Sequence, residues 1–250
     1  MNNNVRRMLA ASVSVGALSA FPAAAAVVSG TGQVNTGADL NDTLTISIAG
    51  ETDLSGVTNT GATSESSVVS NVATGEILQT SNATLADAVA AIVNAGTATV
   101  QAVAHATNAA GSAAATAAIA GVAITQQVSA AGNATGNISN SGGLAIVADA
   151  KASGTTSASA GASLNGGISQ SISAGGATKI ANAKIANSGD LNIEANALST
   201  ATAGAASSGA SLNNGISQAA SAPAGAGISL DNGANGTLTV AENSQATGTT

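Results

Sequence analysis

Residues 140–153 read NSGGLAIVADAKAS, and similar stretches recur as NAGTATVQAVAHAT at 94–107, NSGDLNIEANALST at 187–200 and NGTLTVAENSQAT at 235–247. The glycines that open these stretches are spaced by 46, 47 and 47 residues. A second box recurs inside the first three units, as GVAITQQVSA, NGGISQSISA and NNGISQAASA. Two boxes that recur together at a fixed period predict a repeat architecture, in which each unit packs on its neighbours.

Side chains alternate in character along the first box. Leu144, Ile146 and Ala148 lie on one side of an extended chain, and this side is small and aliphatic in the first three copies. The other side varies freely between copies. Because Thr, Ser, Asn and Gly fill the remaining positions, we predict strands rather than the helices that Ala alone favours. Residues 84–93, where Val89 and Ile92 have helical spacing, stay open between helix and strand.

The sequence therefore predicts an all-β chain that forms a parallel β-helix, or β-solenoid, of stacked coils over residues 94–250. We expect each repeat to form two coils of about 23 residues, which gives a slender rod roughly 50 Å long at about 4.8 Å per coil. Small inward residues fit because the opposed sheets of a narrow solenoid lie close together. Residues 27–93 match the repeat poorly, although TLTISIA at 43–49 reads as a strand, and we expect an N-terminal cap and early coils there.

Two further expectations concern particular residues of the coils. Gln170 with Gln218, and Asn165 with Asn213, recur at equivalent positions and are expected to stack into amide ladders. The Asn/Ser-Gly openings of the boxes are expected to form tight turns with positive φ.

The first 26 residues have the order of a secretory signal peptide. Arg6 and Arg7 precede a mild apolar stretch, and small residues follow at Ala24 to Ala26, so we predict a signal helix over residues 1–26 with cleavage after Ala26. We expect no membrane span in the mature part. The protein is therefore expected to be exported, to the cell surface, the outer membrane or the extracellular medium.

The composition excludes several function classes. The chain has a net charge of −7 with only 5 Lys and Arg, which argues against nucleic-acid binding. It has no Cys, which excludes disulfides, thiolate metal sites and cysteine catalysis. A single Phe, with no Trp or Tyr, leaves Ala, Val, Ile and Leu to fill the core.

Candidate chemistry is sparse. His105 is the single histidine, and Lys151, Leu198 and Gln245 occupy its position in the other copies, which is typical of a solvated outward side chain rather than a catalytic one. Asp39, Asn41 and Asp42 form the densest oxygen cluster, but this cluster does not supply the six to eight ligands that Ca²⁺ prefers.

Two other patterns suggest sites and fall short. Thr-x-Thr pairs at 43/45, 97/99 and 237/239 suggest an ice-binding array, which the intermediate copies interrupt, and Gly30-Thr31-Gly32 lacks the setting of a phosphate loop. We predict no catalytic, cofactor-binding or metal-binding residue and no cofactor.

The fourth copy has no second box before Thr250, so we expect the chain to be the N-terminal part of a longer protein. At its N-S-G-x-L-x-I-x-A-x-A and G-I-S-Q boxes the sequence resembles the large exported β-strand-repeat proteins of Gram-negative bacteria, of the autotransporter-type or haemagglutinin-like adhesin passenger class. The resemblance covers the signal peptide and residues 94–250. It implies surface display, with a role in adhesion or biofilm formation.

Three functions follow as hypotheses. The first is a non-enzymatic structural repeat protein with an adhesin-like role, whose partner is a surface receptor or glycan. The second is a self-assembling functional-amyloid or matrix fibre. The third is a fragment of a polysaccharide-active β-helix enzyme whose catalytic residues lie beyond Thr250.

Overall fold

A computed structural model describes the chain over residues 26–28, 33–38, 42–48, 51–53, 57–60, 67–72, 77–83 and 87–249. Residues 1–25 of the expected signal helix lie outside these ranges. The described part is all-β, with parallel strands stacked in sheets, as the sequence predicts. Within it, no helix has the length and apolar character needed to cross a membrane.

The strands form three parallel sheets, which we call A, B and C. Sheet A has the order β1 (Ala26–Val28), β3 (Asp42–Ile48), β8 (Ala88–Asn94), β11 (Ala134–Asn140), β14 (Ile180–Asn187) and β18 (Gly225–Asn232). Sheet B has the order β16 (Ala205–Leu212), β13 (Ser157–Ala174), β10 (Ser112–Ala130), β7 (Ile77–Ala83) and β2 (Gln33–Ala38), with β17 (Ile216–Ser221) on β13 and β6 (Ser67–Val72) on β10. Sheet C has the order β19 (Thr237–Thr247), β15 (Asp190–Ala201), β12 (Gly143–Gly154), β9 (Thr97–Asn108) and β4 (Glu51–Asp53), with β5 (Val57–Thr60) on β9.

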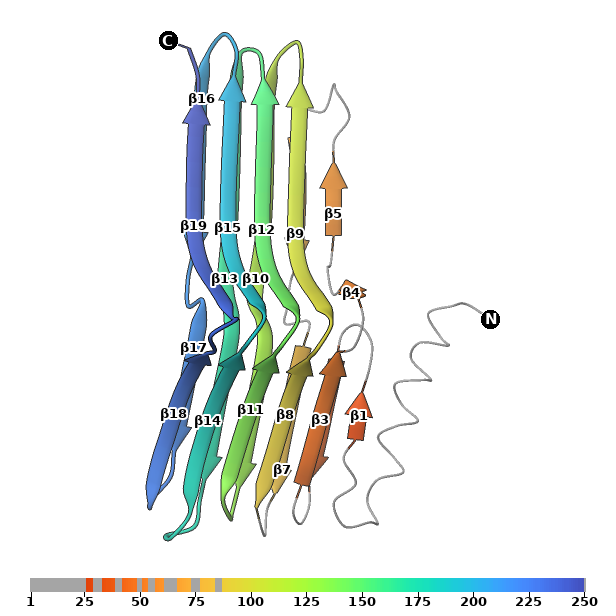
Figure 1. Cartoon of the computed structure of the whole chain (residues 1–250). Helices are drawn as coiled ribbons and strands as arrows, with labels where there is room; N and C mark the ends of the chain where they lie inside the picture. Colours follow the sequence, from red (N-terminus) through yellow and green to blue (C-terminus); the bar gives the residue numbers. More distant parts are fainter. Residues whose placement is uncertain are drawn as a thin grey trace, which may run out of the picture.

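The chain visits the sheets in the order A, C, B and then returns to sheet A one strand further along. Thus β8, β9 and β10 make one circuit, and β11, β12 and β13 make the next. Figure 1 shows the strands of sheets A and C following one another in one layer, while the strands of sheet B run back behind them. We call one circuit a coil. The arrangement is compatible with a β-solenoid.

Each 47-residue repeat forms one coil. Gly143 of β12 pairs with Thr97 of β9 and with Asp190 of β15, which lie 46 and 47 residues away in sequence. The expectation of two coils of about 23 residues per repeat is therefore wrong. The reason is strand length: β10 alone contains 19 residues, which is too long for one side of so short a coil.

The coils are broad and flat rather than slender. The successive strands β14 and β15 contain 8 and 12 residues. At roughly 3.3 Å per residue they extend over about 65 Å. The six strands of sheet A stack over only about 25 Å at roughly 4.8 Å per step. The described part of the molecule thus extends further in the direction of the strands than in the direction in which the coils stack (Figure 1).

Residues 84–93, for which the sequence allows either a helix or a strand, form a strand where the structure describes them. β8 begins at Ala88, and its side chains alternate between the two faces. Val89 is 40% exposed on the outer face, whereas Ile92 is 2% exposed and lies in the core. This alternation has the period of a strand and places the two residues on opposite sides. TLTISIA also reads correctly, since β3 spans Asp42–Ile48 and pairs with β8.

The core consists of rows of identical or similar side chains that run along the stack. Residues at alternate positions of β9, β12 and β15 are buried, which confirms the predicted period of two. In sheet C the rows are Val100, Ile146 and Ile193, and Ala102, Ala148 and Ala195, each 0% exposed. Short side chains also face inward from sheet B, at Ala115, Ala117, Ala160 and Ala162. Because Ala dominates both faces, the two layers enclose a thin core.

One row of buried glutamines binds the coils to one another. Gln126 Nε2 donates to Gln79 Oε1 at 2.6 Å, Gln170 Nε2 donates to Gln126 Oε1 at 2.6 Å, and Gln218 Nε2 donates to Gln170 Oε1 at 2.9 Å. The predicted ladder of Gln170 with Gln218 is therefore confirmed and extends further. Each Nε2 also donates across the coil to a backbone carbonyl oxygen in a strand of sheet A, as Gln126 does to Asn137 at 3.2 Å. The row thus fastens the layers as well as the coils.

A second amide row lies at the end of sheet A. Asn94 Nδ2 donates to Asn140 Oδ1 at 2.7 Å, Asn140 Nδ2 to Asn187 Oδ1 at 2.7 Å, and Asn187 Nδ2 to Asn232 Oδ1 at 2.6 Å. Asn94, Asn140 and Asn187 open the first box, where the sequence analysis assigned them only to turns, whereas Asn232 precedes the box of the fourth copy. For Asn165, by contrast, the recorded hydrogen bond runs to the carbonyl oxygen of Ala120 at 3.0 Å rather than to Asn213.

The glycines after this row are needed for close stacking, not for positive φ. Among the described residues the one non-glycine with positive φ is Asn214, at 50°, and neither Gly142 nor Gly189 has positive φ. A Cβ added to Gly142 would overlap the carbonyl oxygen of Gly96, and one added to Gly189 would overlap that of Gly142. The expected positive-φ turns are therefore wrong, because the constraint comes from the backbone of the neighbouring coil.

The opposite ends of the sheet A strands are tied by Asp87 and Asn133. The Asp87 carboxylate accepts the backbone N–H of Asn133 at 2.7 Å and its Nδ2 at 3.3 Å, one coil further along. Asn133 Oδ1 accepts the N–H of Ile180 in the following coil at 3.1 Å. The backbone bond from Asn133, followed by its side-chain bond, holds the pKa of Asp87 below its ordinary value.

Candidate functional site

The outward face of sheet C carries the most varied side chains of the repeat. The inward rows of β9, β12 and β15 hold mainly small or aliphatic residues, whereas the outward rows change in charge and polarity from coil to coil. One outward row contains His105, Lys151, Leu198 and Gln245, and the next contains Val103, Asp149, Asn196 and Asn243. We refer to these two rows as the outer face of sheet C. The strand alternation fixes their orientation, since each follows a buried inward residue.

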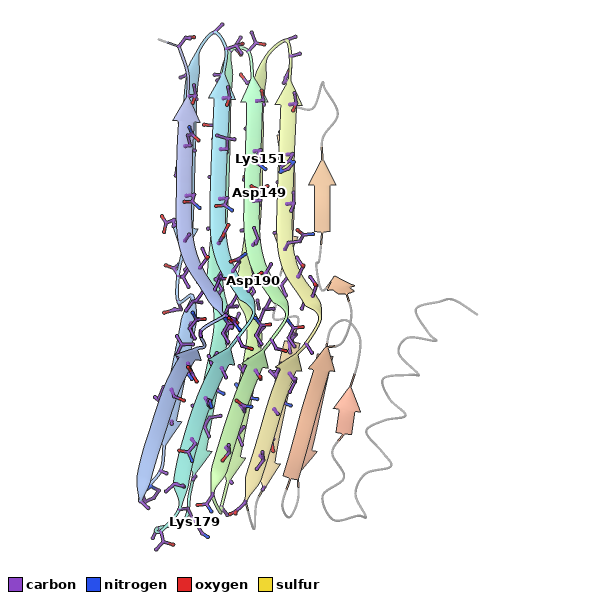
Figure 2. The ribbon with its side chains drawn as sticks, viewed as in Figure 1. Asp149, Lys151, Lys179 and Asp190 are labelled. Carbon is purple, nitrogen blue, oxygen red and sulfur yellow. The ribbon has the colours of Figure 1, made fainter. Side chains whose placement is uncertain are left out.

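Three charged or titratable side chains meet on this face. Asp149 Oδ2 lies 2.9 Å from His105 Nε2 and 3.0 Å from Lys151 Nζ. The exposed fractions of the side chains are 34% for His105, 50% for Lys151 and 18% for Asp149. Asp149 is thus the least exposed member and accepts from both neighbours. Figure 2 shows Asp149 and Lys151 in the middle of β12. Asp190 lies away from them, where the chain bends between β14 and β15, and Lys179 lies in the turn that precedes β14.

A series of side-chain hydrogen bonds lies on the next two strands, β15 and β19. Asn243 Nδ2 donates to Asn196 Oδ1 at 2.7 Å, and Asn196 Nδ2 donates to Glu194 Oε2 at 3.0 Å. The amide of Asn196 is oriented at both ends, by a carboxylate acceptor and by an amide donor. These hydrogen bonds place oriented polar groups beside the Asp149 cluster.

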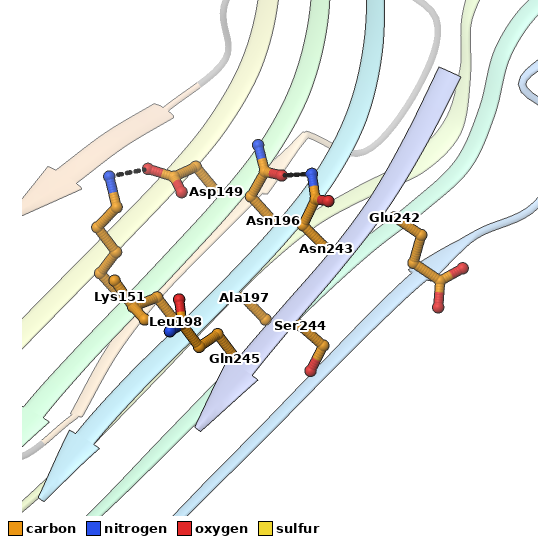
Figure 3. Close-up of a pocket in the computed structure, with 9 residues that line it drawn as sticks. All are labelled: Asp149, Lys151, Asn196, Ala197, Leu198, Glu242, Asn243, Ser244 and Gln245. Carbon is orange, nitrogen blue, oxygen red and sulfur yellow. Dashed lines mark hydrogen bonds and ion pairs between the residues drawn. The ribbon is translucent and has the colours of Figure 1, made fainter. Parts of the chain in front are cut away.

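The Asp149 cluster and the hydrogen-bonded pair Asn196 and Asn243 border an open groove of about 650 Å³. Its lining comes from β12, β15 and β19 and includes Asp149, Lys151, Asn196, Leu198, Asn243 and Gln245. Figure 3 shows Lys151 directed at Asp149 and the Asn196 amide directed at Asn243, while Glu242 points to the other side of β19. A second, smaller hollow of about 280 Å³ adjoins it and is lined by His105, Lys151 and Leu198 among others.

The groove offers several hydrogen-bonding groups to a ligand. It offers amides, a carboxylate and an ammonium group beside the apolar surface of Leu198, a combination that fixes a polar ligand in one orientation. His105 does lie outward, as expected, but its ring is held by Asp149 rather than simply solvated. In the part of the chain that the structure describes, no three His, Cys, Asp or Glu side chains gather as metal ligands.

Several other candidates from the sequence are separated by the fold. Thr97 and Thr99 share the outward face of sheet C with Thr237 and Thr239, and the paired strands between them carry Gly143 and Ala145, then Asp190 and Asn192. Thr43 and Thr45 lie in sheet A instead. Asp39, Asn41 and the stretch Gly30 to Gly32 lie outside the described residues, and Asp42 is the first residue of β3.

Sequence reasoning placed His105 and Lys151 at equivalent positions but missed the cluster that joins them. The signal was present in the register: with Lys151 opposite His105, Asp149 lies two residues away on the same face and within reach of both. Diagonal neighbours on one face of a sheet are close enough for long side chains to meet.

Comparisons with protein-family models, with curated proteins and with solved structures give no match to this chain.

Proposed function

We propose that this chain is a β-solenoid segment of an exported surface protein with an adhesin-like role. It acts without catalysis. It presents the outer face of sheet C to a surface receptor or glycan. The observation that carries the proposal is the contrast between the two faces of sheet C. In β9, β12 and β15 the inward rows keep small or aliphatic side chains and serve the stack, apart from Ser199, whereas the outward rows differ in each coil and border a polar groove.

Two features of the sequence support the wider context of the proposal. Residues 1–26 have the order of a signal peptide, which fits export. The repeat boxes resemble those of autotransporter-type adhesin passengers, which fits surface display. An amide-lined groove matches a hydroxyl-rich ligand, since Asn and Gln supply both donors and acceptors.

Adhesion by the purified chain tests the proposal. The triple variant Lys151→Ala, Asn196→Ala and Asn243→Ala removes polar groups of the groove without touching the core rows. We expect it to lower retention on a glycan panel or on cells at least ten-fold. The matched control is Ser129→Ala, Ser171→Ala and Ser173→Ala on the outer face of sheet B, which should leave retention unchanged. Equal retention of both triple variants, or no retention of the unmodified chain on any surface, would contradict the proposal.

A second candidate function is self-assembly into a matrix fibre. Parallel in-register strands with amide ladders also occur in cross-β assemblies, and this feature favours the candidate. Thioflavin binding by detergent-resistant polymers of the purified chain would support a fibre, whereas a soluble monomer would count against it.

A further inference from the structure

The smaller hollow beside the groove, of about 280 Å³, lies on β9, β12 and β15. Basic side chains are scarce in this chain, which has 5 Lys and Arg, one His and a net charge of −7. His105 and Lys151 nevertheless line this one hollow, and none of the described residues that line it is an Asp or a Glu. We call it the basic hollow. Because each of its three strands is paired on both sides, it belongs to the outer face of the sheet and not to an edge of the stack.

A row of hydroxyl groups forms one side of the basic hollow. Thr107, Ser153 and Thr200 are partners in register on the three strands, and all three line the hollow. Neighbouring strands lie about 4.8 Å apart, so the row presents hydroxyls at about that interval. These hydroxyls have no hydrogen-bond partner among the described residues. The row is therefore free to donate to a ligand.

Asp149 holds the two basic side chains from outside the hollow. Its Oδ2 lies 2.9 Å from His105 Nε2 and 3.0 Å from Lys151 Nζ (Figure 3). Since a carboxylate oxygen only accepts, the proton of the neutral His105 ring lies on Nε2, and Lys151 keeps its other N–H donors. The carboxylate balances the charge of Lys151. Protonation of His105 therefore gives the cluster a net positive charge.

Asp149 and Lys151 are the charged groups closest to His105 on the described strands around β9. Strands β5, β6 and β10 carry no charged residue. The carboxylates of β4 and β15 lie at least four residues along the strands from His105 in register. At roughly 3.3 Å per residue this is about 13 Å or more, beyond the screening length of about 8 Å at physiological salt. The charge of His105 thus decides the net charge beside the hollow.

We propose that the basic hollow binds an anionic group of an acidic glycan, a carboxylate or a sulfate, and binds it more tightly when His105 is protonated. The proposal rests on the adhesin-like function proposed above and names the ligand class for that face. Lys151 supplies charge-assisted donors, the hydroxyl row supplies neutral donors, and Leu198 supplies an apolar surface. Histidine side chains ordinarily change charge between about pH 5 and 8, so binding strengthens as the pH falls through this range.

Dextran, carboxymethyl dextran and dextran sulfate test this proposal, because the three polymers share one backbone. Their dissociation constants for the 250-residue chain are measured at about pH 7.5 and about pH 5.5. We expect at least one anionic polymer to bind about ten-fold more tightly than dextran at the lower pH. Its affinity should rise about three-fold from the higher to the lower pH. Tighter binding of the carboxymethyl form identifies a carboxylate as the preferred group, and tighter binding of the sulfate form identifies a sulfate.

Three variants separate the hollow from the overall charge of the chain. His105→Gln keeps a side chain that can donate to Asp149 but takes up no proton, so it should abolish the rise in affinity at the lower pH. Lys151→Met should weaken binding of the anionic polymer about five-fold at both pH values. Lys184→Met is the matched control, because it removes the same charge from the exposed face of β14 and should leave binding unchanged.

Three outcomes would overturn the proposal. The first is equal binding of dextran and of its two anionic derivatives. The second is an unchanged pH dependence in His105→Gln. The third is an equal loss of affinity in Lys151→Met and Lys184→Met, which would mean that the charge of the whole chain, and not the hollow, attracts the polymer.

The adhesion assay separates this proposal from the adhesin-like function. The double variant Asn196→Ala and Asn243→Ala changes the groove but no residue that lines the basic hollow. It should lose adhesion and keep the pH-dependent binding of the anionic polymer. Adhesion that depends on the groove, without preference for anionic dextrans, would overturn the present proposal alone. Preference for anionic dextrans with the expected pH dependence, without adhesion to any surface, would overturn the adhesin-like function alone.

Discussion

The amide of Asn140 joins three coils through one side chain. It accepts from Asn94, donates to Asn187 and donates to the carbonyl oxygen of Asp190 at 2.9 Å, while its residue is only 3% exposed. Buried polar groups persist only where they are hydrogen-bonded. In a core built mainly of Ala, these directional bonds supply specificity of register that the small side chains cannot.

Replacing Asn140 should therefore destabilise the stack more than replacing the same residue at its edge. We expect Asn140→Ala to lower the free energy of unfolding by about 2–3 kcal/mol, since it leaves buried amide and carbonyl groups without partners. Asn232→Ala, at the exposed end of the row, should cost under about 1 kcal/mol. Urea denaturation followed by circular dichroism measures both, and equal losses would contradict a role for burial.

At the scale of the strand and its turn, close approach between coils explains why glycine recurs. Gly142 and Gly189 lie where the chain passes from sheet A to sheet C, directly against the backbone of the preceding coil. Gly161, in the middle of β13, has open space where a Cβ would be. The same residue type thus has two different roles within one repeat.

This difference gives a matched pair of substitutions. Gly142→Ala should lower the free energy of unfolding by about 2 kcal/mol or more, because the backbones of two coils must separate to admit the methyl group. Gly161→Ala should be neutral or stabilising by up to about 1 kcal/mol, because Gly in a strand interior is entropically unfavourable. Thermal unfolding of the two variants measures both changes in stability. A Gly142→Ala protein as stable as the unmodified chain would show that the turn can move.

The sequence determines some features of the elements and not others. The period of two identified the inward residues of β9, β12 and β15, because burial on one face imposes it. The coil length did not follow, since a spacing of 47 residues between register partners fits one long circuit or two short ones. The break in register between Ile119 and Val122 of β10, opposite the bend from sheet A to sheet C, also carries no periodic signal. For the groove, the repeats place His105 and Lys151 at equivalent positions, but they do not indicate that Asp149 reaches its diagonal neighbour His105.

At the scale of the whole molecule, stability should vary along the stack. β12 is paired with β9 on one side and with β15 on the other, whereas β19 is paired only with β15 in the described structure. Repeat proteins gain stability from neighbouring units, so coils at an edge open more easily than coils in the middle.

Hydrogen exchange followed by mass spectrometry measures this gradient. We expect peptides from β12 to exchange at least ten-fold more slowly than peptides from β19, with β15 close to β12. The intrinsic exchange rate of each peptide, which depends on its own side chains, is divided out before the strands are compared. Equal rates in β12 and β19 would mean that the coils open together as one unit.

The two amide rows run in opposite directions. Each glutamine donates to the coil before it, as Gln170 does to Gln126, whereas each asparagine donates to the coil after it, as Asn140 does to Asn187. Amide groups in series polarise one another, and the polarisation of a single row would grow with every added coil. With one row pointing each way, their dipoles oppose, so a stack of such coils can lengthen without accumulating a net field along its axis.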